Sequence, residues 1–293
     1  MSKKIILVTG SSGQAGKAIA ELLSQQYIVK GLDIIDGKFT NVKGSLNNWA
    51  SMKEITKNID AIVHTAALHA PHISLHSREE FIDTNIKGTL YLLEAAKLNG
   101  VKKLMYTSTT SLYGESMNNP KHAVWITERV MPIARDIYDI TKLAAEELCR
   151  DFFDAEKLQT VSLRVSRFWD EPLDKKVFYR MYRGVDVRDV ATAHKLALEI
   201  SLNNFELFNV SAETIFNIND IKDLRKNLQN FLKNKYPQII DFFASQKWEV
   251  PEYIDRVYII DKAKKILGYQ PLYNIDYLIN QLKGEENDSN LRN

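Results

Sequence analysis

The sequence has few of the residues that hold small or secreted proteins together covalently. Its 293 residues include one cysteine, Cys149, so no intramolecular disulfide can form. Glycine and proline are sparse as well, with 12 and 7 residues, which excludes a collagen-like or linker-like chain. At this length, apolar packing alone is enough to stabilise one large domain or two.

Long apolar runs and blocks of one charge are also absent. No run of about 18 apolar residues predicts a membrane helix, and Lys3 and Lys4 lead into a short β-type run rather than a signal peptide. The net charge is +2, and neither sign is gathered into an arm or tail that would favour nucleic acid. We therefore expect a cytoplasmic protein that binds small molecules, with no nucleic-acid or membrane partner.

Short β-branched runs alternate with helical periodicity through residues 1–165. Strands are expected over 5–9, 27–33, 61–65, 103–108 and 160–165. Helices are expected from about residue 14 and over 48–57, 79–99 and 137–153. This order predicts an α/β fold with a doubly wound parallel sheet of Rossmann type.

The alternation breaks after Val165. Residues 166–283 are expected to form a smaller, mainly helical substrate-binding region, some of whose elements return to the Rossmann sheet. Within it we expect a helix over 188–202, a strand over 207–210 and helical spacing over 218–282, interrupted at 248–257 and at Gly268. The polar tail 284–293 is expected to be frayed.

Three glycines, Gly10, Gly13 and Gly16, lie between the first predicted strand and helix. Gly10 permits a tight turn, Gly13 lets backbone amides approach a pyrophosphate, and Gly16 lets the helix lie against the strand. Ser12 and Gln14 belong to the same loop. The loop is therefore predicted to bind a dinucleotide.

The second predicted strand ends at Asp33. Its carboxylate can accept hydrogen bonds from an adenosine ribose and would repel a 2′-phosphate. Asp33 therefore favours NAD over NADP as the cofactor.

The fourth predicted strand and the helix after it carry a candidate acid–base set. Ser108 and Thr109 end a hydroxyl-rich strand, and Tyr138 and Lys142 lie four residues apart on a later predicted helix. Residues at this spacing share a helix face, so the Lys142 ammonium is expected to lower the pKa of the Tyr138 phenol. Tyr138 would then exchange a proton with a substrate hydroxyl that Thr109 or Ser108 holds.

A second Tyr–Lys pair and a group of three histidines are not assigned to the acid–base set or to a metal site. Tyr258 and Lys262 repeat the four-residue spacing but follow no hydroxyl-rich strand, so Tyr258 is expected to be a packing residue. His69, His72 and His76 lack a companion cluster of cysteines or carboxylates at ligand spacing, so no metal is expected. His69 is retained as a candidate substrate contact.

Together these motifs resemble the extended short-chain dehydrogenase/reductase group, the NAD-dependent epimerase/dehydratase family, over residues 4–283. Segments 60–67, 85–89 and 267–271 add to the resemblance. It implies a Rossmann domain with bound NAD, a Thr109, Tyr138 and Lys142 acid–base set, and a homodimer formed through the helices containing 79–99 and 138–153. It also implies a cofactor cleft formed in part by Ala66, Ala67, Leu68 and Asn85.

Departures from the family pattern bear on the substrate. Thr110 and Ser111 stand where family dehydratases have an acidic pair, which disfavours dehydration. Only about twenty residues separate Arg164 from segment 185–190, so the loops that clamp a nucleotide in nucleotide-sugar epimerases are shortened. This suggests a smaller substrate, or a nucleotide held differently.

Three arginines, Arg167, Arg180 and Arg183, follow the last Rossmann strand and are candidates for contacting a phosphate or carboxylate of the substrate. The competing interpretation is a solvated surface whose side-chain stems pack on aromatic rings.

The sequence thus predicts an NAD-dependent oxidoreductase or epimerase that acts on a secondary alcohol of a sugar or sugar-like substrate. Two alternatives stay open: a nucleotide-sugar 4-epimerase with an atypical clamp, and a non-catalytic, NAD-responsive binding protein. The identity of the substrate and the direction of the reaction are not determined.

Overall fold

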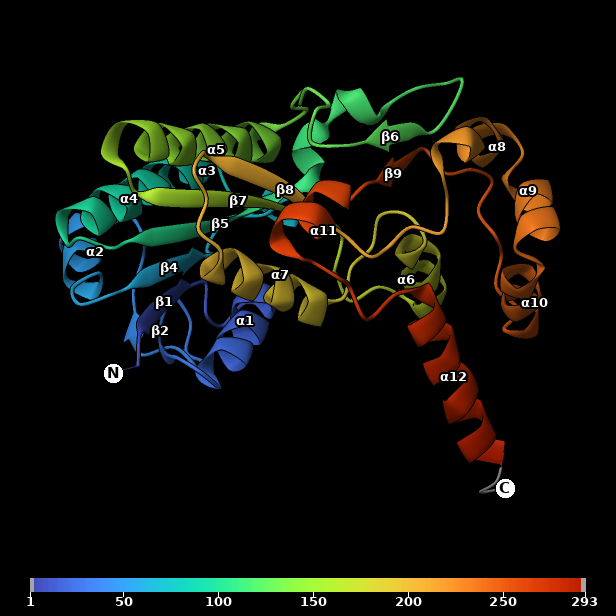
Figure 1. Cartoon of the computed structure of the whole chain (residues 1–293), viewed down its shortest axis with the longest axis horizontal. Coiled ribbons are helices and arrows are strands. Elements are labelled where there is room, and N and C mark those ends of the chain that lie inside the picture. Colours follow the sequence, from blue (N-terminus) through green and yellow to red (C-terminus); the bar gives the residue numbers. More distant parts are fainter. Residues whose placement is uncertain (1–2, 291–293) are drawn as a thin grey trace.

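A seven-stranded parallel sheet forms the centre of the N-terminal lobe (Figure 1). The computed structural model describes residues 3–290, and side chains as far as Gly284. The strand order is β3-β2-β1-β4-β5-β7-β8. From β1 the chain adds β2 and β3 on one side, and β4, β5, β7 and β8 on the other. These strands span β1 Ile5–Thr9, β2 Ile28–Asp33, β3 Val42–Lys43, β4 Ala61–His64, β5 Lys103–Thr109, β7 Gln159–Val165 and β8 Glu206–Val210. The predicted doubly wound α/β sheet is confirmed.

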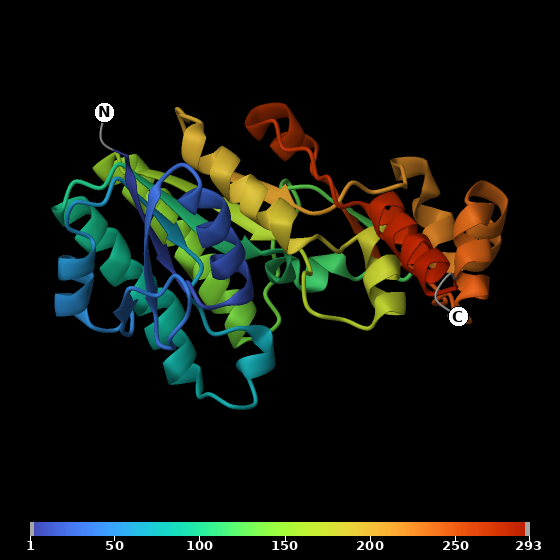
Figure 2. The ribbon, with the colours of Figure 1, turned by 90° about the horizontal axis from the view of Figure 1, so that it is seen from below.

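Helices cover both faces of this sheet, as Figure 2 shows. One face carries α1 Gln14–Ser24, α7 Val187–Glu199 and α11 Asp261–Leu267, and the other carries α2 Trp49–Ile55, α4 Gly88–Leu98 and α5 Ile137–Glu156. The strands are rich in β-branched and other apolar residues because both faces are buried.

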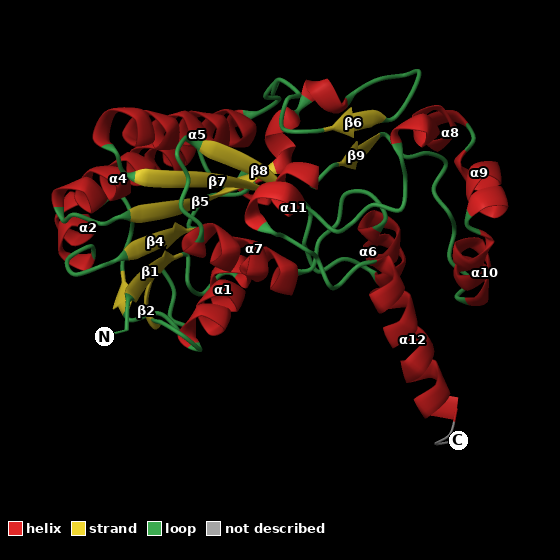
Figure 3. Ribbon diagram, viewed as in Figure 1, coloured by secondary structure: helices red, strands yellow, loops and turns green. Residues whose placement is uncertain are grey.

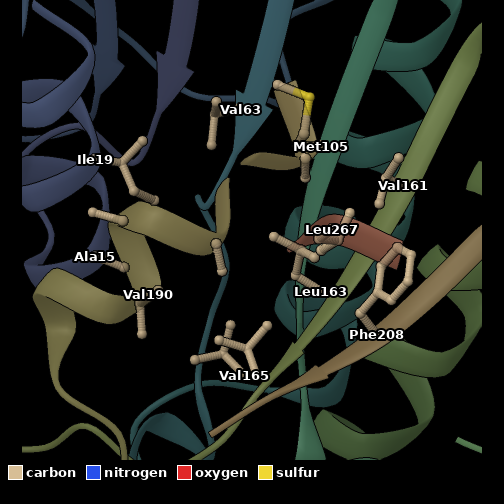
Figure 4. Close-up of a cluster of buried hydrophobic side chains, with 14 of the residues drawn as sticks. Ala15, Ile19, Val63, Met105, Val161, Leu163, Val165, Val190, Phe208 and Leu267 are labelled. Carbon is tan, nitrogen blue, oxygen red and sulfur yellow. The ribbon is translucent and has the colours of Figure 1, made fainter. Parts of the chain in front are cut away.

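A cluster of buried apolar side chains forms the core beneath α1, α7 and α11 (Figure 4). Leu163 of β7, Phe208 of β8 and Leu267 of α11 belong to one cluster of buried side chains, together with Ile19 of α1 and Val190 of α7. Phe208 and Leu163 are fully buried. Strand β8 and helices α7 and α11 therefore belong to the Rossmann lobe in space, although they follow residue 165 in the chain.

The long helix predicted over 79–99 consists of three continuous segments. The α-helix α3 Arg78–Phe81 is followed by a π-helical segment over Ile82–Lys87 and then by α4. A π-helical turn holds an extra residue and is frequent at functional sites. Here it contains Asn85, which is buried.

The second lobe has its own apolar core. Helices α6 Leu173–Arg180, α8 Ile221–Lys226, α9 Leu228–Lys235, α10 Pro237–Ser245 and α12 Ile275–Asn290 surround it. A parallel pair of short strands, β6 Val124–Ile126 and β9 Arg256–Tyr258, lies between the lobes (Figure 3). This pair was not predicted from the sequence, because three-residue strands are too short to show periodicity.

The C-terminal helix α12 extends away from the sheet in Figure 1. It runs through Asn290, so the tail predicted to fray over 284–293 is helical as far as that residue, and residues 291–293 lie outside the described part of the chain. No helix among the described residues is both long enough and apolar enough to span a membrane.

Replacing Phe208 with alanine tests the contribution of the returning strand β8. The fully buried ring would leave a cavity, so we expect the free energy of unfolding in urea to fall by about 3–5 kcal/mol. The control is Leu272→Ala, at a side chain that is 68% exposed, with an expected change within about 0.5 kcal/mol. Equal losses in both variants would contradict the assignment of β8 to the core.

Candidate active site

A cleft of about 1110 Å³ lies at the carboxyl edge of the sheet. In an open parallel sheet, ligands bind at this edge, beside the point where the strand order reverses. The predicted site residues that line the cleft are Gly10, Gly13, Gln14, Gly16, Asp33, Ala66, Ala67, Leu68, His69, Ser108, Thr109, Tyr138, Lys142, Arg167 and Arg183. Residues far apart in the sequence thus share one site.

The glycine loop is built around the carbonyl oxygen of Gly10. Gly10 has φ +70°, and a Cβ atom on Gly16 would lie 2.0 Å from that oxygen. Gly16 therefore allows α1 to approach the loop itself, whereas the sequence pattern had placed that contact at the strand. Gly13 is exposed, and a Cβ atom there would lie 3.3 Å from the same oxygen.

The start of α1 is suited to an anion. Its N-cap is Gly13, which has no side chain to bond the first amides of the helix. Free amides at a helix N-terminus, together with the helix dipole, favour a phosphate group. The loop residues therefore fit the pyrophosphate of a dinucleotide.

Asp33 ties the glycine loop to the end of β2. Its carboxylate accepts hydrogen bonds from the backbone amides of Ser12 (2.9 Å) and Ile35 (3.2 Å), and it also lines the cleft. The Ser12 side chain bonds Thr40 Oγ1 (2.7 Å) and donates to the Ile35 carbonyl (3.2 Å). Ser12 is not among the residues that line the cleft, so it supports the loop and Asp33 remains the residue that would meet a ribose.

Asn85 holds the segment that follows β4. Its Oδ1 accepts from the Leu68 amide (2.8 Å), and its Nδ2 donates to the Leu68 carbonyl (3.0 Å) and to Thr141 Oγ1 (3.0 Å). Asn85 does not line the cleft, whereas Ala66, Ala67 and Leu68 do. Asn85 therefore positions this wall of the cleft relative to α5.

Helix α5 brings Tyr138 and Lys142 to the cleft. The helix begins after Asp136, whose side chain accepts a hydrogen bond from the Asp139 amide (2.9 Å) and so caps the first turn. The Thr109 hydroxyl is near enough to the Tyr138 phenol to act on its pKa, and both residues line the cleft. Ser108 Oγ is buried and has no hydrogen-bond partner among the described residues. The four predicted catalytic residues therefore converge.

The protonation states differ from the expectation. Burial raises the pKa of the Tyr138 phenol above its usual value, and the nearby Thr109 hydroxyl only partly opposes this. Lys142 Nζ donates to the Thr107 carbonyl (2.6 Å) and lies 4.2 Å from the centre of the Tyr106 ring. The predicted lowering of the Tyr138 pKa by Lys142 is therefore wrong.

Burial also acts on Lys142 itself. It lowers the pKa of the ammonium to about 7, although Glu146, one turn further along α5, favours the charged form. Burial thus favours the neutral amine of Lys142 over the ammonium.

A buried ion pair fixes α5 against the sheet. Arg164 of β7 donates from Nε and Nη2 to the Glu146 carboxylate, at 3.0 Å and 2.7 Å. The Arg164 guanidinium lies 4.9 Å from the ring centre of Tyr113, whose hydroxyl donates to Asn209 Oδ1 (2.7 Å). Asn209 Nδ2 donates to the carbonyls of Ile126 and Ile259, at 3.2 Å each. The network joins α5 to the β6–β9 pair.

The candidate substrate arginines lie in different surroundings. Arg180 does not line the main cleft: its side chain is buried, donates to the Tyr273 carbonyl and faces Asp186 at 3.7 Å. We therefore assign Arg180 a structural place between α6 and α12. Arg167 and Arg183 line the cleft, and Arg167 is paired with Glu171.

Aromatic groups from two loops meet beside Tyr138. The His69 ring lies 6.0 Å from the Tyr138 ring and 6.3 Å, edge-on, from Trp169. Burial, and then the nearby Lys142, lower the pKa of His69 to about 4, so its imidazole is neutral at pH 7. His69 and Trp169 thus form a wall of the cleft next to the acid–base residues.

Several residues that line the cleft were not predicted from the sequence as site residues. Arg135, Arg256 and Tyr258 all line the cleft. Tyr258 is buried and stacks on Tyr113, as expected of a packing residue, but it also faces the site. The only sequence signal at Tyr258 was its four-residue spacing to Lys262, and this spacing did not indicate that Tyr258 would face the cleft.

A family comparison agrees with this geometry. The profile of the NAD dependent epimerase/dehydratase family matches residues 6–169. The chain belongs to this family. It is therefore an NAD-dependent enzyme of the short-chain dehydrogenase/reductase type, as the sequence predicted.

Individual relatives of the family differ in activity. A 3-beta-hydroxysteroid dehydrogenase from Mycolicibacterium neoaurum is 25% identical, over 92% of this chain and 88% of its own length. UDP-glucose 4-epimerase 4 from Oryza sativa subsp. japonica is 28% identical, over 55% of this chain and 48% of its own length. These two relatives have different substrates, so membership of the family leaves the substrate undecided.

Solved structures share the fold over nearly the whole chain. A short-chain dehydrogenase/reductase superfamily protein from Agrobacterium tumefaciens, with bound NAD, has a TM-score of 0.74 at 19% identity and covers 99% of this chain and 100% of its own. The UDP-glucose 4-epimerase from Thermotoga maritima has a TM-score of 0.70 at 23% identity, over 96% and 99%. The second lobe thus belongs to the shared architecture.

Two glycine variants separate folding from cofactor binding. Gly16→Ala places a Cβ atom against the Gly10 carbonyl, so the free energy of unfolding should fall by about 1–3 kcal/mol. Gly13→Val, at an exposed residue, should lower the free energy of unfolding less than Gly16→Ala does, and should weaken NAD binding at least tenfold, measured by calorimetry. Normal NAD affinity in Gly13→Val would contradict the assignment of the loop.

The pKa of Lys142 predicts a pH-dependent stability. Folding lowers this pKa from 10.5 to about 7, so the cost of the buried ammonium is largest below pH 7 and falls as the pH rises towards 10.5. Lys142→Met removes the cost. Its gain in unfolding free energy over the wild type should be about 2–3 kcal/mol larger at pH 6 than at pH 9. Exposed Lys17→Met is the control, and a gain for Lys142→Met that does not vary with pH would refute the prediction.

Proposed function

We propose that this enzyme oxidises a secondary alcohol of a sugar or sugar-like substrate to a ketone, or catalyses the reverse reduction of the ketone, with Tyr138 as the acid–base residue. The observation that carries the proposal is the convergence of Tyr138, Lys142, Thr109 and Ser108 on the cleft that the glycine loop and Asp33 also line. A protein that only binds NAD has no need of this set.

The hydroxyl residues hold the reacting oxygen of the substrate. Thr109 lines the same cleft as Tyr138, and the buried Ser108 Oγ, which has no partner among the described residues, can bond a ligand. Both groups donate and accept hydrogen bonds, so they can bind the oxygen as an alcohol or as a carbonyl.

Tyr138 moves the proton. Burial keeps the phenol protonated at pH 7, which suits donation to a carbonyl oxygen. For the reverse step, the Thr109 hydroxyl, which opposes the rise of the Tyr138 pKa, can stabilise the phenolate. NAD, when bound, supplies the acceptor or donor of the hydride.

The candidate cofactor contacts are shared among four segments. We assign the pyrophosphate to the loop of Gly10, Gly13 and Gly16, with Gln14 at the start of α1. Asp33 would bond the adenosine ribose, and Ala66, Ala67 and Leu68 would line the cofactor cleft beside Tyr138 and Lys142. This set rests on the shape of the cleft and on the family membership.

We also propose a homodimer formed through α4 and α5, as the family resemblance implied. Leu98 at the end of α4 is 64% exposed and Ile140 on α5 is 51% exposed, and pairing of these helices would cover apolar side chains of this kind.

Tyr138→Phe tests the proton transfer. Loss of the hydroxyl should lower turnover by about 10²–10⁴-fold, whereas the affinity for NAD should stay within about twofold. Tyr91→Phe, on α4 and outside the cleft, is the control and should keep full activity. Turnover that survives in Tyr138→Phe would remove the proposed acid–base residue.

The type of reaction is read from the fate of the cofactor. An epimerase must retain NAD, whereas a dehydrogenase must release the reduced form. We propose to measure the NAD content after desalting, and the absorbance at 340 nm with added NAD and a panel of free and nucleotide-linked sugars. Product stereochemistry is then determined for each sugar that reacts.

A further inference from the structure

A buried histidine, His194 of α7, packs against the strand that carries Ser108 and Thr109. Both of its ring nitrogens have partners. Nδ1 lies 2.8 Å from the Val190 carbonyl oxygen, one turn back along α7, and Nε2 lies 2.8 Å from the Thr107 hydroxyl of β5. The imidazole ring therefore joins α7 to β5 close to the acid–base residues.

The chemistry of the two partners fixes the direction of both hydrogen bonds. A carbonyl oxygen can only accept, so Nδ1 of His194 carries the hydrogen and donates it to Val190. Burial lowers the pKa of His194 to about 4, so the ring is neutral at pH 7 and its Nε2 has a lone pair. The Thr107 hydroxyl therefore donates its single hydrogen to His194, and this bond anchors the Thr107 side chain.

Thr107 also meets Lys142, which comes from the other face of the sheet. Helices α5 and α7 lie on opposite sides of β5 (Figure 1). Strand β4 pairs with β5 only as far as Tyr106, so at Thr107 the neighbouring strand is β7 alone. The Thr107 carbonyl accepts a hydrogen bond from Lys142 Nζ (2.6 Å). Thr107 thus bonds His194 through its side chain and Lys142 through its backbone.

Lys142 depends on such an anchor because its side chain is long, flexible and buried. Fixing a lysine side chain in one conformation costs rotamer entropy, which its contacts must offset. The contacts of Lys142 Nζ are the Thr107 carbonyl and the ring of Tyr106, whose centre is 4.2 Å away. A carbonyl that accepts a hydrogen bond from an ammonium favours the charged form of the amine. A shift of the Thr107 carbonyl would therefore move the ammonium and disfavour its charge.

We propose that His194 is a positioning residue that holds the Lys142 ammonium in the cleft, acting through Thr107 from the opposite face of the sheet. His194 itself does not line the cleft, whereas Thr107 and Lys142 do. The proposal rests on the proposed function for the role of Lys142 as a cofactor contact. It adds α7 to the elements that set the geometry of the site.

The test measures the pKa of Lys142 in the full chain, so it does not depend on turnover. Lysine labelled with ¹³C at Cε gives NMR signals that follow the charge of each amine, and the signal lost in Lys142→Met identifies Lys142. His194→Leu removes the acceptor of the Thr107 hydroxyl and should lower the pKa of Lys142 by about 0.5 or more. Thr107→Val keeps the carbonyl, removes the hydroxyl and should act in the same direction.

The ionisable groups nearest to Lys142 stay in place in these variants. They are Tyr138, Glu146 and Cys149 on α5, Tyr106 on β5, His64 on β4 and His69 in the loop after β4. His194→Leu and Thr107→Val remove the two ends of one hydrogen bond. Their combination should therefore lower the pKa of Lys142 no further than the more effective single variant does.

Two further variants separate positioning from a general loss of stability. His194→Gln places an amide oxygen near the position of Nε2, where it can accept from Thr107, and should keep the pKa of Lys142 within about 0.2 of the wild-type value. Thr160→Val is the matched control. Thr160 is buried and its hydroxyl also joins a strand to a helix, donating to the Cys149 carbonyl (2.5 Å), but it does not line the cleft. Its loss should leave the pKa of Lys142 unchanged.

An unchanged or raised pKa of Lys142 in His194→Leu or in Thr107→Val would overturn the proposal, and so would an equal fall in Thr160→Val. If His194→Leu does not fold, Thr107→Val decides alone, because valine keeps the shape of threonine and deletes one hydroxyl.

The affinity for NAD, measured by calorimetry, gives the consequence for the site. Lys142→Met, His194→Leu and Thr107→Val should each bind NAD about threefold or more weakly than the wild type. Weaker binding in Lys142→Met together with normal binding in His194→Leu would also overturn the positioning. Normal NAD affinity in Lys142→Met would instead refute the proposed cofactor contact at Lys142, and a lowered pKa of Lys142 in His194→Leu would still support the positioning.

Discussion

The buried ion pair between Arg164 and Glu146 is the interaction on which the arrangement of the site depends. It bridges β7 and α5, and both side chains are almost fully buried. Removal of one partner would leave an uncompensated charge in the core, which typically costs about 3–5 kcal/mol. Because Tyr138 and Lys142 lie on the same helix as Glu146, their distance from the strand end at Thr109 is set by this pair.

The same ion pair reaches the second lobe through polar contacts. The Tyr113 ring lies against the Arg164 guanidinium, and its hydroxyl donates a hydrogen bond to Asn209. The Asn209 amide in turn donates to the carbonyls of Ile126 and Ile259, at the β6–β9 pair. Nearly every polar group along this path has a partner, as buried groups require. The wall of the cleft on β9 is thus held in a fixed place relative to the acid–base residues on α5.

Burial also decides the protonation of the site. The spacing of Tyr138 and Lys142 correctly predicted that both would face one cleft. It did not predict that Lys142 would donate to the Thr107 carbonyl, because that contact joins α5 to β5 and has no counterpart in the spacing of the helix. Burial away from water then raises the pKa of the Tyr138 phenol and lowers the pKa of the Lys142 ammonium.

Much of the Rossmann lobe was predictable, because each of its longer strands is a run of apolar and β-branched residues next to a helical period. Strand β9 was not, because three residues carry no period, and its effect on the cleft arises from pairing with β6. The contrast between Arg180 and Arg256 has the same cause. Arg180 follows a recognised strand but turns towards α12, whereas Arg256 reaches the cleft through a contact between distant segments.

The position of β9 late in the chain has a consequence for biosynthesis. A ribosome releases the glycine loop, Tyr138 and Lys142 well before it adds residues 256–258, and domains generally fold from the N-terminal side during translation. A nascent chain therefore presents its dinucleotide-binding surface before the opposite wall of the cleft exists. Strand β8, which covers β7, is also made late, so until then the edge of β7 is open to other strands.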